Sequence, residues 1–434
     1  MKKKVLIIDG ASSGRELALS LINNGHEVYH MTSGAEESYN ITPEHRAKYL
    51  SGMTDGVDYI KCFNYDTSKT AEENAELLRP YGIEAVIPGT ESGVYTSEKI
   101  CRALGLKGND PETSYRRRDK YYMQKALKEA GIRSIDMLLT SSCDEAIEFF
   151  RKQRNGRMII KPCSSAGSEM VFLCNCEDDI RNYFEEYLGK KDFYGNVNDE
   201  FLIQEYISGT EYVANSVSRN GKHLLAEAYE YKKINTGGDG GFFLYDRMIL
   251  LHDVDDYPLD YINAALDAVG IEYGVSHMEF KVDDRGPVMI EVAARPMGES
   301  CREYNKEALG YDITELILDA HSSDEDYEKW YEKLNGKYDP AKYYIVKIVI
   351  SILEGKLKDI PAYKNIAELK TVRNVNLIKA LKKMELFVSD NEISSPGEVY
   401  LLGDSWEDVN RDAETIYDWE RNHPEKLFTL EEQQ

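Results

Sequence analysis

A lysine followed by a loop of small residues is the first feature of this chain that could do chemistry. The segment 157–162 predicts a short strand that carries Lys161 and stops at Pro162. The loop that follows contains Ser164, Ser165, Gly167 and Ser168. Hydroxyls and unhindered backbone N–H groups in such a loop can hold phosphate oxygens, and the lysine adds a point charge. Small-residue turns after strands are common, so an ordinary turn is the alternative interpretation.

Two glutamates twelve residues apart could bind a metal ion. Glu279 lies on an expected strand, 276–282, and Glu291 lies on an expected return strand, 288–292. If the hairpin pairs about the connection 283–287, both carboxylates fall on one face and can share a cation. Carboxylates on apolar strands need such a cation, and oxygen ligands that leave room for phosphates favour Mg²⁺, or Mn²⁺. A pair of glutamates on a solvent face is the alternative.

A third segment is suited to a flat heterocycle. The expected strand 201–206 ends in Gln204, Glu205 and Tyr206, and Ile207 leads into a glycine turn with Glu211 beyond it. A strand that breaks into a glycine turn exposes backbone groups that can bind the edge of a heterocycle, and a nearby carboxylate can hold vicinal hydroxyls.

Three other segments are candidates for binding substrates or anions. Glu91 follows the expected strand 82–88 at the end where open sheets bind ligands, although it could instead cap the helix 92–104. Residues 235–241 contain Gly237 and Gly238 and predict a mobile lid or a substrate loop. Three arginines at 116–118 open an expected helix to about residue 130. This placement disfavours the helix dipole and suggests an anion, with a solvated basic face as the alternative.

The elements that must position these residues form three units. Residues 1–112 alternate strands and helices, which predicts a parallel sheet with helices on both faces. The turn 10–14 lacks the full glycine fingerprint of dinucleotide-binding folds. Residues 113–325 are expected to form a central unit, divided into a small part (113–200) and an antiparallel part (201–325). Residues 326–434 predict a C-terminal antiparallel sheet with helix. The fold class is therefore α/β and α+β.

The composition excludes several classes of protein. The net charge of −24 argues against a nucleic-acid surface, which needs clustered lysine and arginine. No run approaches the roughly 20 apolar residues that cross a bilayer. The basic N-terminus is followed by only four apolar residues, so we expect a first strand and no export signal. Seven scattered cysteines, an odd number, indicate reduced thiols and a cytoplasmic protein.

Taken together, these segments resemble the ATP-grasp superfamily, and the resemblance covers nearly the whole chain. It is strongest to the L-amino-acid (dipeptide) ligases, a branch of the carboxylate–amine ligases. The matching segments are 118–123, 160–168, 204–211 and 279–295, in this order and spacing. The resemblance implies an ATP-grasp fold with an N-terminal α/β domain, a central ATP-binding unit of two subdomains and a C-terminal domain. It also allows a homodimer.

The resemblance implies roles for individual residues. Lys120 and Lys161 would reach the nucleotide phosphates, and the Ser164–Ser168 loop would close over the γ-phosphate. Glu205 and Ile207 would contact adenine through backbone groups, Glu211 would bind the ribose, and Glu279 and Glu291 would hold Mg²⁺. Arg295 would stabilise the transferring phosphoryl group, and Glu91 would hold an amino group of the substrate. His277 would line the acceptor site or be an ordinary strand histidine, and Gly298 also counts among the candidate substrate residues. One departure is Ala293, which stands where many relatives complete the metal site with asparagine.

The function we expect is ATP-dependent ligation of a small-molecule carboxylate and an amine through an acyl phosphate, with release of ADP and phosphate. An acyl phosphate is readily hydrolysed, so such a site needs a lid that excludes water. Two alternatives stay open. One is a purine-type ligase or a carboxylase similar to biotin carboxylase. The other is a nucleotide-binding protein with weak or lost catalysis, which Ala293 would explain.

Overall fold

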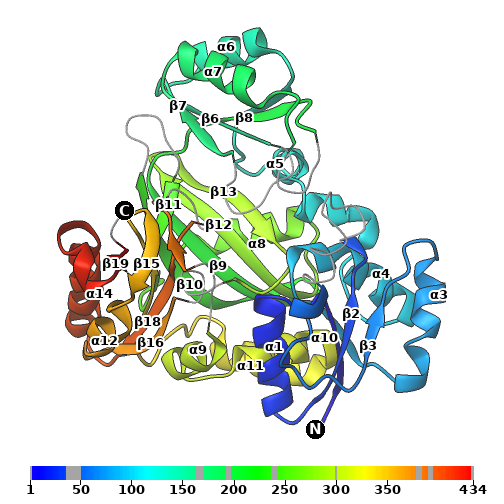
Figure 1. Ribbon diagram of the computed structural model, residues 1–434. Coiled ribbons are helices and arrows are strands. Elements are labelled where there is room, and N and C mark those ends of the chain that lie inside the picture. The colour runs from blue at the N-terminus through cyan, green and yellow to red at the C-terminus, as the bar shows by residue number, and fades with distance from the viewer. Residues whose placement is uncertain are drawn as a thin grey trace.

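The protein forms three lobes around a long sheet, as the computed structural model shows (Figure 1). The described residues are 2–35, 50–162, 170–191, 197–235, 243–298, 301–377, 384–389 and 394–431. In this part of the chain, the helices are all too short or too polar to cross a membrane.

The N-terminal lobe contains the expected parallel sheet, in the order β3-β2-β1-β4. Its strands are β1 (Lys4–Ile8), β2 (Glu27–Thr32), β3 (Cys62–Asn64) and β4 (Ala85–Pro88). Its helices are α1 (Ser13–Asn23), α3 (Ala71–Glu76) and α4 (Val94–Leu104), with 3₁₀ turns η2 (Arg79–Tyr81) and η3 (Glu91–Gly93). The strand order reverses between β1 and β4, so the loops after these strands flank the crevice where such sheets bind ligands.

Glycines allow those two loops to touch. A Cβ atom on Gly14 would lie 2.7 Å from the Cα atom of Gly89, closer than such atoms approach in proteins. Gly14 therefore serves the packing of the two loops, which is consistent with the incomplete dinucleotide fingerprint in this turn.

A small antiparallel sheet, β5-β8-β6-β7, forms the second lobe with two helices on one face (Figure 1). Its elements are β5 (Met137–Thr140), α6 (Cys143–Arg151), β6 (Met158–Pro162), β7 (Phe172–Cys174), α7 (Glu177–Tyr187) and β8 (Phe201–Glu205). The turn η4 (Pro111–Arg117) and the helix α5 (Lys120–Glu129) connect it to the N-terminal lobe. The helix that we expected from residue 116 thus begins at Lys120, because the Asp119 side chain accepts hydrogen bonds from the N–H groups of Tyr121 and Tyr122.

The third sheet has eight antiparallel strands in the order β13-β12-β9-β10-β11-β14-β18-β16. Its central strands are β9 (Thr210–Arg219), β10 (Lys222–Asn235), β11 (Phe243–Leu250), β12 (Gly274–Asp283) and β13 (Gly286–Ala293). The last three are β14 (Tyr343–Val349), β16 (Val372–Asn376) and β18 (Gly397–Gly403). The sheet is therefore continuous across residue 325, where we expected a boundary between domains.

One face of the central sheet is apolar and the other carries the candidate site. Met278, Phe280, Met289 and Val292 pack with the helix α8 (Leu259–Ala268), which the sequence did not predict. Because side chains alternate along a strand, the residues next to them in β12 and β13 point to the opposite face. The helix α5 packs in the same apolar cluster, and its Gln124 Nε2 donates to the carbonyl of Met289 (2.9 Å).

Three helices join the central sheet to the N-terminal lobe. They are α9 (Arg302–Leu309), α10 (Ile313–Ser322) and α11 (Asp324–Leu334). Leu316 and Ile317 of α10 lie in one apolar cluster with Ile7 of β1 and Val217 of β9. The N-terminal lobe is thereby fixed against the sheet that carries Glu279 and Glu291.

The remaining C-terminal elements cover the far end of the long sheet. They are β15 (Gly355–Asp359), α12 (Ala362–Ala367), β17 (Glu385–Leu386), α14 (Trp406–Asn422), η5 (Pro424–Lys426) and β19 (Thr429–Leu430). A separate sheet, β17-β15-β19, lies here. Lys347 of β14 is fully buried and pairs with Glu420 of α14 (2.7 Å) and Asp246 of β11 (3.0 Å).

Candidate functional site

Glu279 and Glu291 face each other across the β12–β13 hairpin, as we expected. They are direct partners in the strand register, so their side chains leave the same face. The connection is shorter than the five residues expected: the strands extend to Asp283 and Gly286 and leave a turn of Asp284 and Arg285. Pro287 is tolerated inside β13 because β13 is an edge strand of the sheet.

Lys120 joins this pair from the helix α5. Its Nζ lies 2.9 Å from Glu291 Oε2. Burial opposes the charge of Lys120, but Glu291, Glu91 and Glu279 outweigh it and raise the pKa of Lys120. Burial likewise would raise the pKa of Glu291, but Lys120 and Lys161 overcome this effect and lower it. Both groups are therefore charged at neutral pH.

Glu279 is surrounded by cationic and polar groups. Its Oε1 lies 3.5 Å from His277 Nε2 and accepts a hydrogen bond from the Tyr245 hydroxyl (3.3 Å). Burial opposes the charged form, yet His277, Lys233 and Lys120 together lower the pKa of Glu279 to about 2. The carboxylate is ionised at any physiological pH and suits a cation.

Lys161, at the end of β6, belongs to the same group of charges. It is 6% exposed, and burial followed by the charge of Lys120 lowers its pKa to about 7. Glu291, Glu279 and Lys233 also act on it. The structure thus brings Lys120, Lys161, Glu279 and Glu291 together from two lobes, although they are far apart in sequence.

Glu91 and Arg295 meet beside these residues. Glu91 Oε2 lies 3.6 Å from Arg295 Nε, and Glu91 Oε1 lies 3.6 Å from Arg118 Nε. Burial raises the pKa of Glu91, and the two arginines act against that rise. Two guanidinium groups already share this carboxylate, so a substrate ammonium would have to compete with them for it.

The other two arginines of the 116–118 triplet do not support an anion site. Arg117 is fully buried, and its Nε donates to Glu98 Oε1 (2.9 Å) while its Nη1 donates to the carbonyl of Val269 (3.0 Å). Arg117 therefore fixes the N-terminal lobe to the end of α8. Arg116 is partly exposed and lies beside the ring of Tyr115. Of the three arginines, Arg118 alone reaches Glu91 in the charged group described above.

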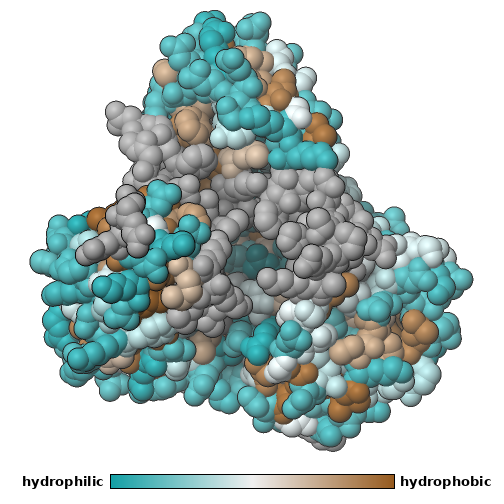
Figure 2. Space-filling view, in the orientation of Figure 1, coloured by the Kyte–Doolittle hydropathy of each residue, from teal (hydrophilic) through white to brown (hydrophobic). Residues whose placement is uncertain are grey.

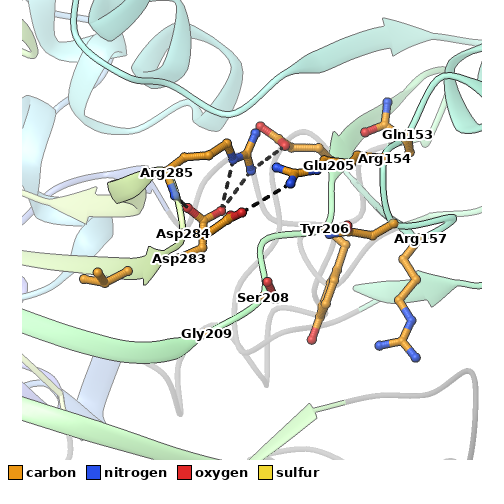
Figure 3. A pocket seen from close by; sticks show the side chains of 12 residues that line it. Gln153, Arg154, Arg157, Glu205, Tyr206, Ser208, Gly209, Asp283, Asp284 and Arg285 are labelled. Carbon is orange, nitrogen blue, oxygen red and sulfur yellow. Dashed lines mark hydrogen bonds and ion pairs between the residues drawn. The ribbon is translucent and has the colours of Figure 1, made fainter.

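The segment 205–209, which we call the hinge, leads from the small sheet to the central sheet. All of its residues except Ile207 line a cavity of about 460 Å³, together with residues 153–155, Arg157 and the turn 282–285. Glu205 Oε2 pairs with Arg285 (2.9 Å) and Asp284 pairs with Arg154 (3.3 Å), while Tyr206 and Arg157 extend together away from these ion pairs (Figure 3). The Glu205 side chain thus anchors the hinge to the β12–β13 turn.

Gln204, just before the hinge, and Ile207, within it, have different environments. Gln204 is 3% exposed, and its Nε2 has no hydrogen-bond partner among the described residues. The carbonyl of Ile207 accepts a hydrogen bond from Lys281 Nζ (3.4 Å). Adenine contacts by Glu205, Tyr206 and Ile207 stay a prediction.

Glu211, expected at a ribose, is paired with two lysines. Its Oε1 lies 2.5 Å from Lys233 Nζ, and its Oε2 lies 3.6 Å from Lys281 Nζ. It is 4% exposed. A ribose would therefore have to displace a lysine from this carboxylate or share it.

Several candidate residues cannot be placed. Ser164, Ser165, Gly167 and Ser168 lie outside the described residues, and so do Gly237 and Gly238. Gly298 is described, and no atom of the described residues lies within 4 Å of a Cβ built on it. Its role as a substrate residue stays a prediction.

The residues present fit a divalent cation that is bound largely by a nucleotide. Glu279 and Glu291 supply oxygen ligands, as Mg²⁺ prefers, and Mg²⁺ in nucleotide sites typically takes one or two carboxylates plus phosphates. In the described part of the chain, no three His, Cys, Asp or Glu side chains are grouped so as to hold a metal ion by themselves.

The sequence analysis missed two lysines of the site, Lys233 and Lys281. Lys281 lies two residues after Glu279 on β12, so the period of two along a strand already placed it on the same face. Lys233 could not be found in this way, because it lies at the end of β10, just before residues 235–241, which we expected to form a loop.

Comparison with known proteins identifies the family. A model of the ATP-grasp domain matches residues 155–303, which span β6, the hinge and the β12–β13 hairpin. The chain is 34% identical to dapdiamide A synthase of Enterobacter agglomerans over 319 residues, which is 71% of each protein. The chain belongs to the ATP-grasp ligases.

This ATP-grasp ligase is also similar to other proteins that are ligases of amino acids. It is 24% identical over 331 residues to alanine–anticapsin ligase of Bacillus subtilis, which covers 68% of this chain and 69% of that protein. Its fold matches the crystal structure of an L-amino acid ligase from Bacillus licheniformis with a TM-score of 0.71 and 15% identity, over 99% of both chains. The fold that we expected from the sequence is thereby confirmed.

A hollow opens between the three lobes of this ligase, and hydrophilic residues lie at its floor (Figure 2). Residues of three sheets reach the charged group described above: Glu91 follows β4, Lys161 ends β6, and Glu279 and Glu291 lie on β12 and β13. We refer to this charged group as the cleft.

Proposed function

We propose that this ATP-grasp ligase joins an amino acid to a second amino acid or a similar amine, and that the carboxylate is activated as an acyl phosphate. The observation that carries the proposal is the convergence of Lys120 and Lys161 with Glu279 and Glu291 in one cleft, beside Arg295 and Glu91. Names of similar proteins support amino acids as substrates, since one of them ligates alanine.

The first step is attack of the substrate carboxylate on the γ-phosphorus of ATP, which releases ADP. Phosphoryl transfer builds up negative charge on crowded oxygens, so positioning and cationic stabilisation supply most of the catalysis. Lys120 and Lys161 would bind the phosphates, and Arg295 would bind the transferring group. A divalent ion held by Glu279 and Glu291 would supply charge neutralisation and orientation of the phosphates.

The second step is attack of the amine on the acyl phosphate, which forms the amide and releases phosphate. Glu91 lies 3.6 Å from Arg295, so a substrate ammonium bound by Glu91 would be held next to the acyl group. Binding two reactants side by side removes much of the entropy cost of their encounter. Water must be excluded until the amine attacks.

A product screen tests this proposal. The purified protein with ATP, Mg²⁺ and pairs of amino acids should release equal amounts of ADP, phosphate and dipeptide. Release of AMP and pyrophosphate would exclude the acyl-phosphate route. Turnover that requires bicarbonate or a ribosyl amine would point to a carboxylase or a purine-type ligase, and ATP binding without turnover would point to lost catalysis.

A further inference from the structure

Among the described residues, four arginines are buried, and Arg302 differs from the other three. Each of those three has a carboxylate partner, in the pairs Arg117–Glu98, Arg219–Asp324 and Arg247–Asp246. Arg302 is 5% exposed, yet its Nε and Nη2 have no hydrogen-bond partner in the described part of the chain. A guanidinium stays charged at every physiological pH, and a buried charge without a counter-ion is costly. Arg302 is therefore suited to an anion that comes from a ligand.

Arg302 is the first residue of α9, which lies on the cleft face of the central sheet. Asn305, three residues later and on the same side of the helix, donates to Glu227 Oε1 and to the Tyr229 hydroxyl (3.1 Å). Helical side chains tilt toward the N-terminal end of their helix. The side chain of Arg302 therefore extends toward the end of α9 that follows Arg295 in the chain.

The strand register orders the cleft face in rows of residues that lie side by side on neighbouring strands. The rows, in order from the hinge, are Lys281 with Glu211, Glu279 with Glu291, and His277 with Asn215 and Glu227. Successive rows on one face are about 7 Å apart. The first row contains the expected ribose ligand and the second contains the expected metal ligands, so the third row lies beyond the phosphates.

Arg302 belongs to the third row. Its neighbour Asn305 contacts Glu227 of that row, and Met297 Sδ lies 3.3 Å from Asn215 Nδ2 of the same row. The segment that follows Arg295 thus passes over the third row before α9 begins. An anion bound by Arg302 would therefore lie farther from the hinge than the γ-phosphate.

This position separates the two reactants of a ligase. The acid that becomes activated must place its carboxylate against the γ-phosphate, at the second row. A carboxylate one row farther belongs to the other reactant, the amine. The planar fork of a guanidinium can bind a carboxylate through two parallel hydrogen bonds, and the N-terminal end of a helix also favours negative charge.

We propose that Arg302 binds the free carboxylate of the amine substrate, and that this substrate is therefore an amino acid and not a simple amine. The carboxylate takes no part in bond formation, so it keeps its charge throughout the reaction and becomes the C-terminal carboxylate of the dipeptide. The inference rests on the proposed function, which supplies the two reactants.

Kinetics with a charged and an uncharged amine test the proposal. The product screen identifies the amino acid that serves as the amine, and its carboxamide has the same shape without the charge. For the wild-type protein, kcat/KM should be at least about 100-fold higher with the amino acid than with the carboxamide. In Arg302→Met this preference should fall below about threefold, while the KM values of ATP and of the acid stay within about twofold.

Lys306→Met is the matched control for these kinetics. Lys306 is an exposed cation on the same helix and pairs with Asp312. Its variant should keep the wild-type preference for the amino acid.

Thermal unfolding of the free protein gives a readout that does not depend on activity. Arg302→Met removes a buried charge that has no partner, so it should raise the midpoint of unfolding. Arg219→Met is the comparison, because Arg219 is equally buried but pairs with Asp324 and donates to the carbonyl of Ala320 (2.6 Å). It should lower the midpoint.

Three results would overturn the inference. A raised KM for ATP in Arg302→Met would assign the guanidinium to the phosphates. A lowered midpoint of unfolding with an unchanged preference for the amino acid would make Arg302 a structural residue. In both cases dipeptide is still formed and the proposed function survives. If the wild-type protein forms no dipeptide from any pair of amino acids, the proposed function fails and the inference fails with it.

Discussion

Lys161 is a cleft residue that is only partly protonated near neutral pH. Burial and the neighbouring Lys120 lower its pKa to about 7, from an ordinary value of 10.5. A triphosphate beside the ammonium favours the charged form and raises the pKa again. Nucleotide binding between about pH 7 and 10 must therefore take up a proton, and affinity must fall as the pH rises through this range.

Proton uptake is the first prediction. Calorimetric titration with ADP at pH 8, in two buffers of different ionisation enthalpy, should show uptake of up to one proton. Lys161→Met, which cannot titrate, should show almost none. Uptake of the same size in both proteins would mean that another group accounts for it.

The second prediction concerns Glu291. Replacing it with glutamine keeps its shape but removes the charge that pairs with Lys120 and that we propose binds a divalent ion. ADP formation should fall on the order of 10²- to 10³-fold, the size typical of a lost electrostatic contact in a transition state. Glu272→Gln, an exposed change just before β12, is the control and should keep full activity. Equal activities of the two variants would refute the assignment of Glu291 to the catalytic site.

At the scale of elements, the β12–β13 hairpin could be predicted because its pattern is local. Polar residues alternate with Met278, Phe280 and Val292, and this alternation alone fixed which residues share a face. The predicted turn was too long, because the two strands extend to Asp283 and Gly286, and these residue types are typical of loops.

The arginines at 116–118 show the limit of a local reading. Their sequence cannot distinguish a buried structural arginine from one in a binding site. The hydrogen-bond acceptors of Arg117, which are Glu98 and the carbonyl at the end of α8, lie outside the local sequence around it. The buried hydrogen bonds that link His277 to Asn215 and Asn215 to Glu227 were missed for the same reason, since each residue comes from a different strand.

The third prediction tests the hinge. Gly209 has a φ of +106°, and a Cβ there would collide with the backbone carbonyl of Val282. Gly209→Ala should lower the free energy of unfolding by about 1–3 kcal/mol and weaken ADP binding, because the hinge must shift away from β12. Gly286→Ala is the control, since Gly286 has a similar φ of +99° but no described atom within 4 Å of its Cβ position.

Urea unfolding and ADP titration of both variants measure these effects. The variant at Gly286 should lose only the cost of the backbone strain and should keep its nucleotide affinity. Equal losses in the two proteins would show that the contact of the hinge with β12 is unimportant.

For the whole molecule, the eight-stranded sheet is the feature that the sequence could not show. Strands β11 and β14 pair directly although residues 251–342 separate them. Strand pairing over such a distance leaves no local pattern. The C-terminal residues therefore extend the sheet that carries the cleft.

The fourth prediction concerns the buried charges that fix α14 to this sheet. Lys347 and Glu420 are both fully buried as an ion pair, with Asp246 beside them. Glu420→Ala should lower the free energy of unfolding by about 3–5 kcal/mol, since it removes a partner of a buried ammonium. The double variant Lys347→Met and Glu420→Leu should be more stable than the single variant, as thermal unfolding can show. If the double variant is instead less stable than the single variant, the ion pair of Lys347 and Glu420 stabilises the fold more than apolar side chains would.

The charge of the whole molecule makes the cleft distinct. The chain carries a net charge of −24, yet among the described residues six cationic side chains and four carboxylates gather in the cleft. The cations are Lys120, Lys161, Lys233, Lys281, Arg118 and Arg295, and the carboxylates are Glu91, Glu211, Glu279 and Glu291. A local excess of positive charge in an acidic protein suits a polyanionic substrate such as ATP.

A crystal structure with ADP and Mn²⁺ is the most direct test of this account. We predict that the diphosphate contacts both Lys120 and Lys161 and that the metal ion lies on Glu279 and Glu291. A nucleotide bound elsewhere, or one that contacts neither lysine, would contradict the assignment of the cleft as the catalytic site.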